Sequence, residues 1–156
     1  MDARAVAQLR LLEEWQTNSE RYPMNMQRKA LDVGFGVGSM LKLLESTYCI
    51  FGVEADPSML DLAKSRLSPK ATIKQASFRS EMFEARMFDV VVASHVLEHI
   101  RAPVEFLSGL LQLLRPKEGV LLLEVPNSTP NRVREIINHN HKGLGHLHFL
   151  VFAHCI

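Results

Sequence analysis

The sequence has little of the material from which several common classes of protein are built. Its 156 residues include only two cysteines, Cys49 and Cys155, which are too few for a disulfide-stapled secreted domain. No apolar run approaches the roughly 20 residues of a membrane-spanning helix, and the N-terminus lacks the apolar segment of a signal peptide. A net charge of +1 gives no general attraction to nucleic-acid phosphates. We therefore expect a cytoplasmic globular protein with neither a membrane nor a nucleic-acid partner.

What the sequence does contain is a regular alternation of strand-like and helix-like segments. Apolar runs typical of strands occupy residues 29–33, 48–54, 71–76, 88–94 and 120–127. Helical patterns occupy residues 2–17, 39–46, 56–67 and 102–114, and Asp56 and Pro57 form a typical helix start. This alternation predicts an α/β domain with a Rossmann-like, doubly wound, mostly parallel sheet. Ligands of such sheets bind at the carboxyl ends of the strands.

The segment "LDVGFGVG", which follows the first strand, is the most informative motif. A dinucleotide-binding turn needs G-x-G-x-x-G, but the position of its third glycine is Ser39. The glycines fall instead at Gly34, Gly36 and Gly38, two residues after Asp32 and at alternate positions. No lysine of a P-loop follows. The spacing argues against a nicotinamide-dependent oxidoreductase and against a nucleoside triphosphate site.

Four motifs together resemble those of the class I S-adenosylmethionine-dependent methyltransferases. They are "LDVGFGVG", "GVEADPSMLDLAKSRL", "FDVVVASHVLEHI" and "LLRPKEGVLLLEVPN", and they stand in the family's order and spacing between about residues 28 and 127. The subgroup most similar in appearance includes the ubiquinone-biosynthesis O-methyltransferases. The resemblance implies the strand order 3-2-1-4-5, S-adenosylmethionine as cofactor, and methyl transfer to an oxygen or nitrogen of a small-molecule acceptor.

The resemblance also implies a set of cofactor-binding residues. Asp32 would bind the amino group of the cofactor, the glycine loop would pass beneath its methionine and ribose parts, and Glu54 would bind both ribose hydroxyls. Ala55 and Met59 would flank one side of the adenine, and Ser77 and Phe78 the other. Ser94 and His95 would lie beside the methionine part and the methyl group. The full predicted set is Asp32, Gly34, Phe35, Gly36, Gly38, Glu54, Ala55, Met59, Ser77, Phe78, Ser94 and His95.

A second cluster, His95, Glu98 and His99, forms H-x-x-E-H after the fourth strand. On a helix these positions share a face, so the three side chains could converge on a metal or act as acid–base groups. We favour a hydrogen-bonded wall of the methyl site without a metal, with His95 or His99 as candidate catalytic bases.

The C-terminal part departs from the pattern of the family. A complete fold has seven strands, whereas the residues after 127 supply one helical pattern, 131–139, and one apolar run. We therefore expect a single domain over residues 1–156 that is C-terminally incomplete, without strands six and seven. Its fifth strand would be left as an exposed edge, and the apolar run at 148–156 would either partly cover this edge or mediate a homodimer contact. A non-catalytic S-adenosylmethionine-binding or regulatory subunit is the alternative function.

Most of the histidines lie in this C-terminal part, and the resemblance implies that it forms a lid over the acceptor. One of them would lie near the acceptor, and a zinc site is the alternative that we favour less. These histidines are His139, His141, His146, His148 and His154.

Overall fold

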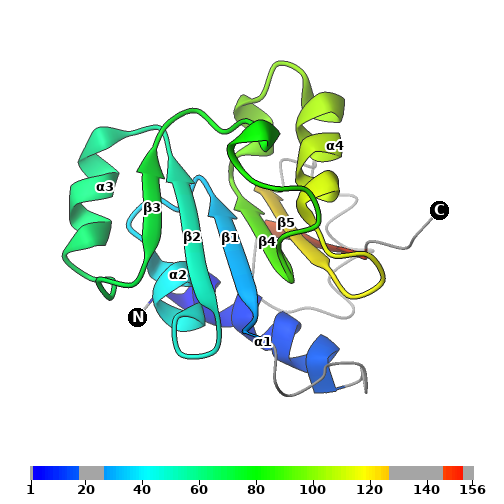
Figure 1. Ribbon diagram of the computed structural model, residues 1–156, viewed down its shortest axis with the longest axis horizontal. Helices are drawn as coiled ribbons and strands as arrows, with labels where there is room; N and C mark the ends of the chain where they lie inside the picture. Colours follow the sequence, from blue (N-terminus) through cyan, green and yellow to red (C-terminus); the bar gives the residue numbers. More distant parts are fainter. Residues whose placement is uncertain (1, 18–26, 127–145, 153–156) are drawn as a thin grey trace, which may run out of the picture.

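The computed structural model describes residues 2–17, 27–126 and 146–152 of the chain (Figure 1). Its helices are α1 (Ala3–Thr17), α2 (Ser39–Leu44), α3 (Pro57–Lys64) and α4 (Pro103–Leu113), with short 3-10 turns η1 (Ser80–Met82) and η2 (Leu97–His99). Its strands are β1 (Lys29–Val33), β2 (Cys49–Glu54), β3 (Thr72–Gln75), β4 (Val90–Ser94), β5 (Val120–Pro126) and β6 (His146–Phe152). The helices and strands predicted between residues 2 and 127 therefore all form, with ends that differ by a few residues.

The strands form one sheet in the order β3-β2-β1-β4-β5-β6. Strands β1 to β5 pair in parallel, and β6 pairs antiparallel with β5 along its whole length, from Val120↔Phe152 to Pro126↔His146. The predicted α/β class, the Rossmann-like sheet and the order 3-2-1-4-5 are confirmed.

The expected absence of a sixth strand is wrong. The sequence of β6, "HLHFLVF", alternates only weakly between polar and apolar residues, but it is rich in residues that favour strands. It pairs with the edge of β5 that we expected to be exposed. The proposed dimer contact through a free β5 edge therefore has no basis. The predicted helix at 131–139, the lid and the histidines His139, His141 and His154 lie outside the described residues.

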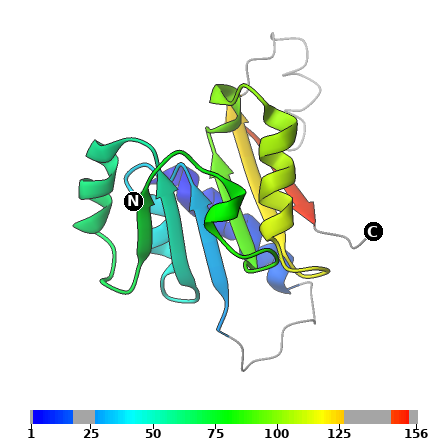
Figure 2. The ribbon, with the colours of Figure 1, turned by 45° about the horizontal axis from the view of Figure 1, so that its top comes forward.

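Side-chain alternation along the strands divides the core into two layers. Even-numbered strand residues such as Val90 and Val92 pack against α1, α2 and α3. Odd-numbered residues such as Val91 and Ala93 pack against α4 and the segment around η1. Helix α4 accordingly lies on the opposite side of the sheet from α1 and α2 (Figures 1 and 2). Both faces of β4 are covered, which explains its uninterrupted apolar sequence.

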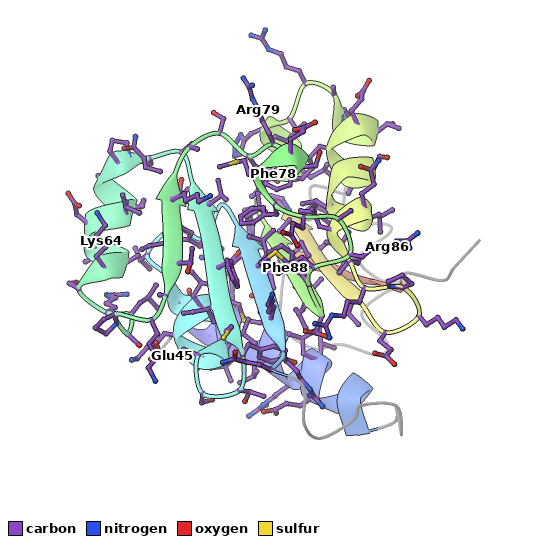
Figure 3. All side chains as sticks on the ribbon, viewed as in Figure 1. Glu45, Lys64, Phe78, Arg79, Arg86 and Phe88 are labelled. Carbon is purple, nitrogen blue, oxygen red and sulfur yellow. The ribbon has the colours of Figure 1, made fainter. Side chains whose placement is uncertain are left out.

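Aromatic rings fill the layer beneath α4. Phe88 is fully buried and packs edge-to-face against Phe51 and Phe83, with ring centroids 5.3 and 5.2 Å apart. Phe78 and Phe88 point toward the interior, whereas Arg79 and Arg86 point outward (Figure 3). Within the described ranges, no helix is both long and apolar enough to cross a bilayer.

Candidate active site

The glycine loop joins β1 to α2 with a backbone that other residues rarely adopt. Gly34, Gly36 and Gly38 have φ angles of 73°, 52° and 77°. These angles lie in the left-handed region, where a glycine avoids the Cβ clash that strains other residues. A Cβ at Gly34 would lie 2.4 Å from Cγ2 of Val96, whereas one at Gly36 would have no atom within 4 Å. The loop therefore packs tightly at Gly34 and leaves open space above Gly36.

Phe35 belongs to the core more than to the loop surface. Its side chain is 6% exposed and packs in the layer beneath α2. A Cβ at Gly52 would lie 2.5 Å from the Phe35 ring, so Gly52 leaves the room that the ring needs. Only the backbone of Phe35 is therefore free to take the predicted role in cofactor binding.

Glu54 ends β2 directly beside the glycine loop. Its Oε2 accepts a hydrogen bond from the Gly36 N–H at 2.8 Å, and its Oε1 accepts one from the Asp56 N–H at 2.9 Å. Each carboxylate oxygen accepts about two hydrogen bonds, so each retains capacity for a further donor. The two backbone bonds fix the carboxylate at the carboxyl edge of the sheet, next to the open space above Gly36.

Asp32 lies one residue before the end of β1 and is 3% exposed. The pKa of the Asp32 carboxyl is raised to about 7, mainly by burial and secondly by the nearby charge of Glu54. A buried carboxyl without a cationic partner favours its neutral form, and a cation placed beside it would favour the charged form. This site is therefore suited to a positively charged ligand group.

The residues predicted to flank an adenine follow β2 and β3, which are neighbours in the sheet. Ala55 and Ser77 are exposed, and Met59 is half-buried. Phe78 is half-buried and packs edge-to-face on Phe106 of α4, with ring centroids 5.6 Å apart. This packing anchors the loop after β3 to the α4 side of the sheet.

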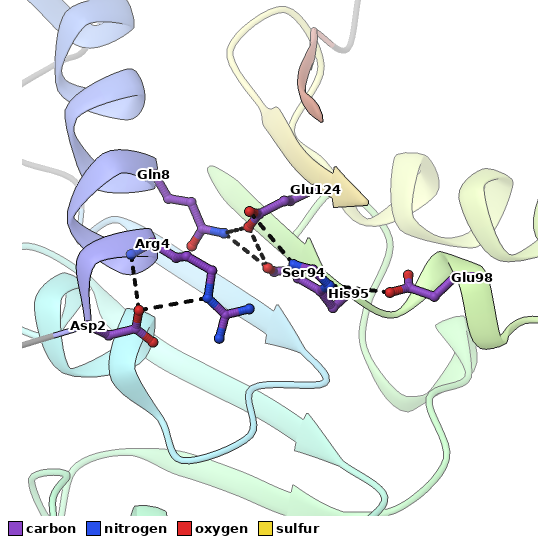
Figure 4. A network of polar contacts seen from close by, with 7 residues as sticks. All are labelled: Asp2, Arg4, Gln8, Ser94, His95, Glu98 and Glu124. Atoms are coloured by element: carbon purple, nitrogen blue, oxygen red, sulfur yellow. Dashed lines mark hydrogen bonds and ion pairs between the residues drawn. The ribbon is translucent and has the colours of Figure 1, made fainter. Parts of the chain in front are cut away.

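A polar network lies on the α1 face of the neighbouring strands (Figure 4). Ser94 of β4 and Glu124 of β5 are register partners, and both occupy even-numbered positions, so their side chains face α1. The Ser94 hydroxyl donates to Oε2 of Glu124 at 2.6 Å. Gln8 of α1 donates through Nε2 to Ser94 Oγ at 3.1 Å and also to Glu124 Oε2. Glu124 is 0% exposed, so α1 is joined to the sheet through a fully buried carboxylate.

His95 follows β4 with a φ of 57°, in the left-handed region. Its backbone N–H donates to the Glu124 carbonyl at 3.0 Å. Its Nδ1 lies 3.4 Å from Oε1 of Glu98, and its Nε2 lies 3.8 Å from Oε1 of Glu124.

His95, Glu98 and His99 do not lie on one helix, the case in which they would share a face. Only residues 97–99 form a 3-10 turn, because the left-handed backbone at His95 breaks the helical path. His95 and Glu98 still approach each other, but His99 is exposed. Among the residues with described positions, no group of histidine, cysteine and acidic side chains has the arrangement of a metal site.

Only some of these residues line the same cavity, which has a volume of about 260 Å³. The predicted cofactor-binding residues that do not line it are Gly38, Glu54, Ala55, Met59, Ser77 and Phe78. Asp32 of β1 and the glycine loop, including Gly34 and Gly36, line it. Ser94 and His95 at the end of β4 also line it, as do the first turns of α1. The α1 residues at the cavity are Asp2, Arg4, Ala5 and Gln8.

Sequence reasoning missed Gln8 and Glu124. The only sequence signals are a polar residue within the apolar pattern of 2–17 and an acid that ends the run "VLLLE". Neither indicates that the two side chains meet across 116 positions of sequence.

The comparisons with known proteins agree with this geometry. A family model described as a methyltransferase domain matches residues 5–155. A tRNA U34 carboxymethyltransferase of Idiomarina loihiensis is 37% identical, over 71% of this chain and 36% of its own length. A trans-aconitate 2-methyltransferase of Methylobacterium radiotolerans is 30% identical, over 69% of this chain and 42% of its own length. A ubiquinone biosynthesis O-methyltransferase of Haemophilus ducreyi is 28% identical, over 65% of this chain and 47% of its own length. The chain thus spans less than half the length of these relatives.

Solved structures share the fold at lower identity. The complex between the Haloferax volcanii Trm112 methyltransferase activator and a methyltransferase matches with a TM-score of 0.60, 22% identity, and coverage of 88% of this chain and 64% of that one. The phosphoethanolamine N-methyltransferase 2 of Haemonchus contortus, solved with S-adenosylmethionine, matches with a TM-score of 0.59 and 22% identity. The match covers 85% of this chain and 31% of that one. At this identity the likeness concerns the fold alone.

Proposed function

Because the chain belongs to the class I S-adenosylmethionine-dependent methyltransferases, we propose that it transfers the methyl group of this cofactor to a small-molecule acceptor. The observation that carries the proposal is the cavity with two unlike sides. The side formed by Asp32 and the glycine loop suits a cofactor, and the side formed by Ser94, His95 and α1 suits an acceptor.

The cofactor half fits S-adenosylmethionine by shape and by charge. The open space above Gly36 is the space that a side chain would fill, so a flat ligand group can lie against the backbone there. Asp32, which has no cationic partner among the described residues, would hold the amino group of the methionine part, directly or through water. Glu54, already oriented by two backbone N–H groups, would accept the two ribose hydroxyls.

We propose that the adenine lies beyond Glu54, along the loops that follow β2 and β3. Ala55 and Met59 would contact one side of it, and Ser77 and Phe78 the other. The contact between Phe78 and Phe106 would hold that wall in place.

The residues around the cavity would promote transfer mainly by alignment and by exclusion of water. Bound S-adenosylmethionine supplies a methyl group on a sulfonium, and transfer breaks the sulfur–carbon bond as a carbon–oxygen or carbon–nitrogen bond forms at the acceptor. A hydroxyl acceptor must also lose its proton, and a side chain at the cavity would take it. His95 lines the cavity whereas exposed His99 does not, so His95 is the better placed of the two candidate bases.

A transfer assay with the full chain tests this proposal. The purified chain is given methyl-labelled S-adenosylmethionine with a panel of small phenols, alcohols, amines and carboxylic acids, and separately with bulk tRNA. We expect label in at least one small molecule, none in tRNA, and none when Glu54→Ala replaces the natural chain. Label in tRNA alone would contradict the small-molecule acceptor. Cofactor binding by calorimetry without transfer to any substrate would favour the alternative, a non-catalytic binding or regulatory subunit.

A further inference from the structure

The orientation of the Gln8 side-chain amide is determined by its two polar neighbours. Its Nε2 donates to both Ser94 Oγ and Glu124 Oε2. A carboxylate oxygen only accepts hydrogen bonds, so a flipped amide would place two acceptors against each other. Gln8 is 3% exposed and Glu124 is 0% exposed, so solvent cannot relieve such a mismatch. The NH₂ group of Gln8 therefore faces the sheet.

The carbonyl oxygen of Gln8 must then face the other way. It lies on the side of the amide that points away from Ser94 and Glu124, toward Asp2 and Arg4 (Figure 4). Asp2 and Arg4 line the same cavity as Gln8. Among the residues that the structure describes, no donor bonds to this oxygen. The cavity wall thus presents a fixed hydrogen-bond acceptor from α1.

The position of Gln8 assigns this acceptor to the methyl-accepting side. Asp32 and the glycine loop line the cavity from the end of β1, whereas Gln8 lines it from α1, and Ser94 and His95 line it from the end of β4. We infer that Gln8 selects the methyl acceptor: its carbonyl oxygen binds an O–H or N–H group of that molecule, and Glu124 holds the amide in the orientation that this requires. The inference rests on the proposed function and narrows it to acceptors that carry a hydrogen-bond donor.

The buried carboxylate gives a second reason for a functional role. An uncharged residue at 124 would continue the apolar run of β5 and would avoid the desolvation of a charge, so the fold alone does not need a carboxylate here. A carboxylate does prevent the flip of the Gln8 amide, which a neutral amide at 124 would permit. Glu124 is in this sense a positioning residue, and Gln8 is the group that touches the acceptor.

Ligand binding without turnover tests the inference directly. The full chain saturated with S-adenosylhomocysteine is titrated with benzyl alcohol, benzylamine and benzyl methyl ether, and binding is followed by ligand-observed NMR. The ether has the same ring but no donor. We expect the alcohol and the amine to bind about three- to tenfold more tightly than the ether, the range for one hydrogen bond. Gln8→Met should abolish this preference, while the affinity for S-adenosylhomocysteine stays within about twofold. The control Glu13→Met, an exposed residue of the same helix, should retain the preference.

Two outcomes overturn the inference. One is equal binding of the three probes to the natural chain, and the other is a loss of S-adenosylhomocysteine affinity in Gln8→Met, which would place Gln8 in the cofactor site. Neither depends on methyl transfer, so a chain that methylates nothing would refute the proposed function and still leave this test decisive.

The orientation of the amide is tested separately, in case Gln8→Met does not fold. The side-chain NH₂ protons of Gln8 should exchange slowly with solvent in the natural chain, and about tenfold faster in Glu124→Gln, where the amide is free to flip. Fast exchange in the natural chain would show that the amide is not held and would overturn the inference.

Discussion

The two halves of the candidate site are built in different ways. The half at β1 and β2 is made mainly of backbone: glycines with positive φ angles, and a carboxylate held by the N–H groups of Gly36 and Asp56. The half at β4 and β5 is made of side chains from three elements, namely Gln8 of α1, Ser94 of β4 and Glu124 of β5. A backbone site has a fixed shape that suits an unchanging cofactor. A site made of side chains can change its shape and polarity through single substitutions. This suits an acceptor site, because the acceptor differs between relatives.

The largest expected effect is on the backbone half, in Gly36→Val. Valine at a φ of 52° is strained, and its side chain would fill the open space that we assign to the cofactor. We expect calorimetry to show no binding of S-adenosylmethionine, while circular dichroism shows a folded domain. Gly36→Ala is the control, since it also places a Cβ on this left-handed backbone but has a smaller, unbranched side chain, and it should bind more weakly than the natural chain but measurably. Normal binding by the valine variant would mean that the loop does not lie beneath the ligand.

The next effect concerns the buried carboxyl of Asp32 and depends on pH. The pKa of Asp32 is about 7 in the folded state and about 4 in the unfolded chain. Between these values the folded state holds a proton that the unfolded state has lost, so stability falls as pH rises through about 4 to 7, by up to about 4 kcal/mol. Urea unfolding of the natural chain and of Asp32→Asn at several pH values measures this, and Asp32→Asn should lose that part of the dependence. The same slope in both chains would contradict the assignment.

Cofactor binding should show the opposite pH dependence. A ligand amino group favours the charged form of Asp32, so affinity for S-adenosylmethionine should rise as pH increases through about 7. In Asp32→Asn the affinity should be lower and should not rise in that range. Calorimetric titrations between about pH 5.5 and 8.5 would detect the difference.

A somewhat smaller effect is expected for Glu54→Ala. The substitution removes charge-assisted hydrogen bonds to two ribose hydroxyls, and we expect S-adenosylmethionine affinity to fall by roughly 1.5–3 kcal/mol. Asp61→Ala is the matched control, because Asp61 is an acid on the following helix whose side chain is 85% exposed. Unchanged affinity in a folded Glu54→Ala chain would show that β2 does not end at the ribose.

The smallest expected effect is that of a chelator on the acceptor half. His95 and Glu98 approach each other as an imidazole–carboxylate pair, and His99 is exposed. We therefore expect EDTA to leave cofactor binding and methyl transfer unchanged. Loss of transfer in EDTA that a divalent ion restores, or an anomalous-scattering peak beside His95, would identify a metal site there and contradict this expectation.

The difference between the halves also explains what sequence reasoning could find. The glycine spacing and Glu54 lie within short segments, and a local backbone requirement such as a positive φ restricts the residue type, so the sequence records it directly. The contact between Gln8 and Glu124 depends on how α1 packs on the sheet, and no local pattern reports it. The H-x-x-E-H spacing did not reveal how its three residues lie, because they share a face only on a helix and the left-handed backbone at His95 interrupts the helical path. The run at 146–152 was hard to interpret because, in the sheet that the structure describes, this strand pairs with one neighbour alone.

A crystal structure of the full chain with S-adenosylhomocysteine would test the division of the cavity most directly. We expect the ribose hydroxyls on Glu54, the amino group beside Asp32, and the sulfur facing Ser94 and His95, with the space next to Gln8 left open for an acceptor. A ligand whose ribose lies away from Glu54, or one that fills the space at Gln8, would contradict the account.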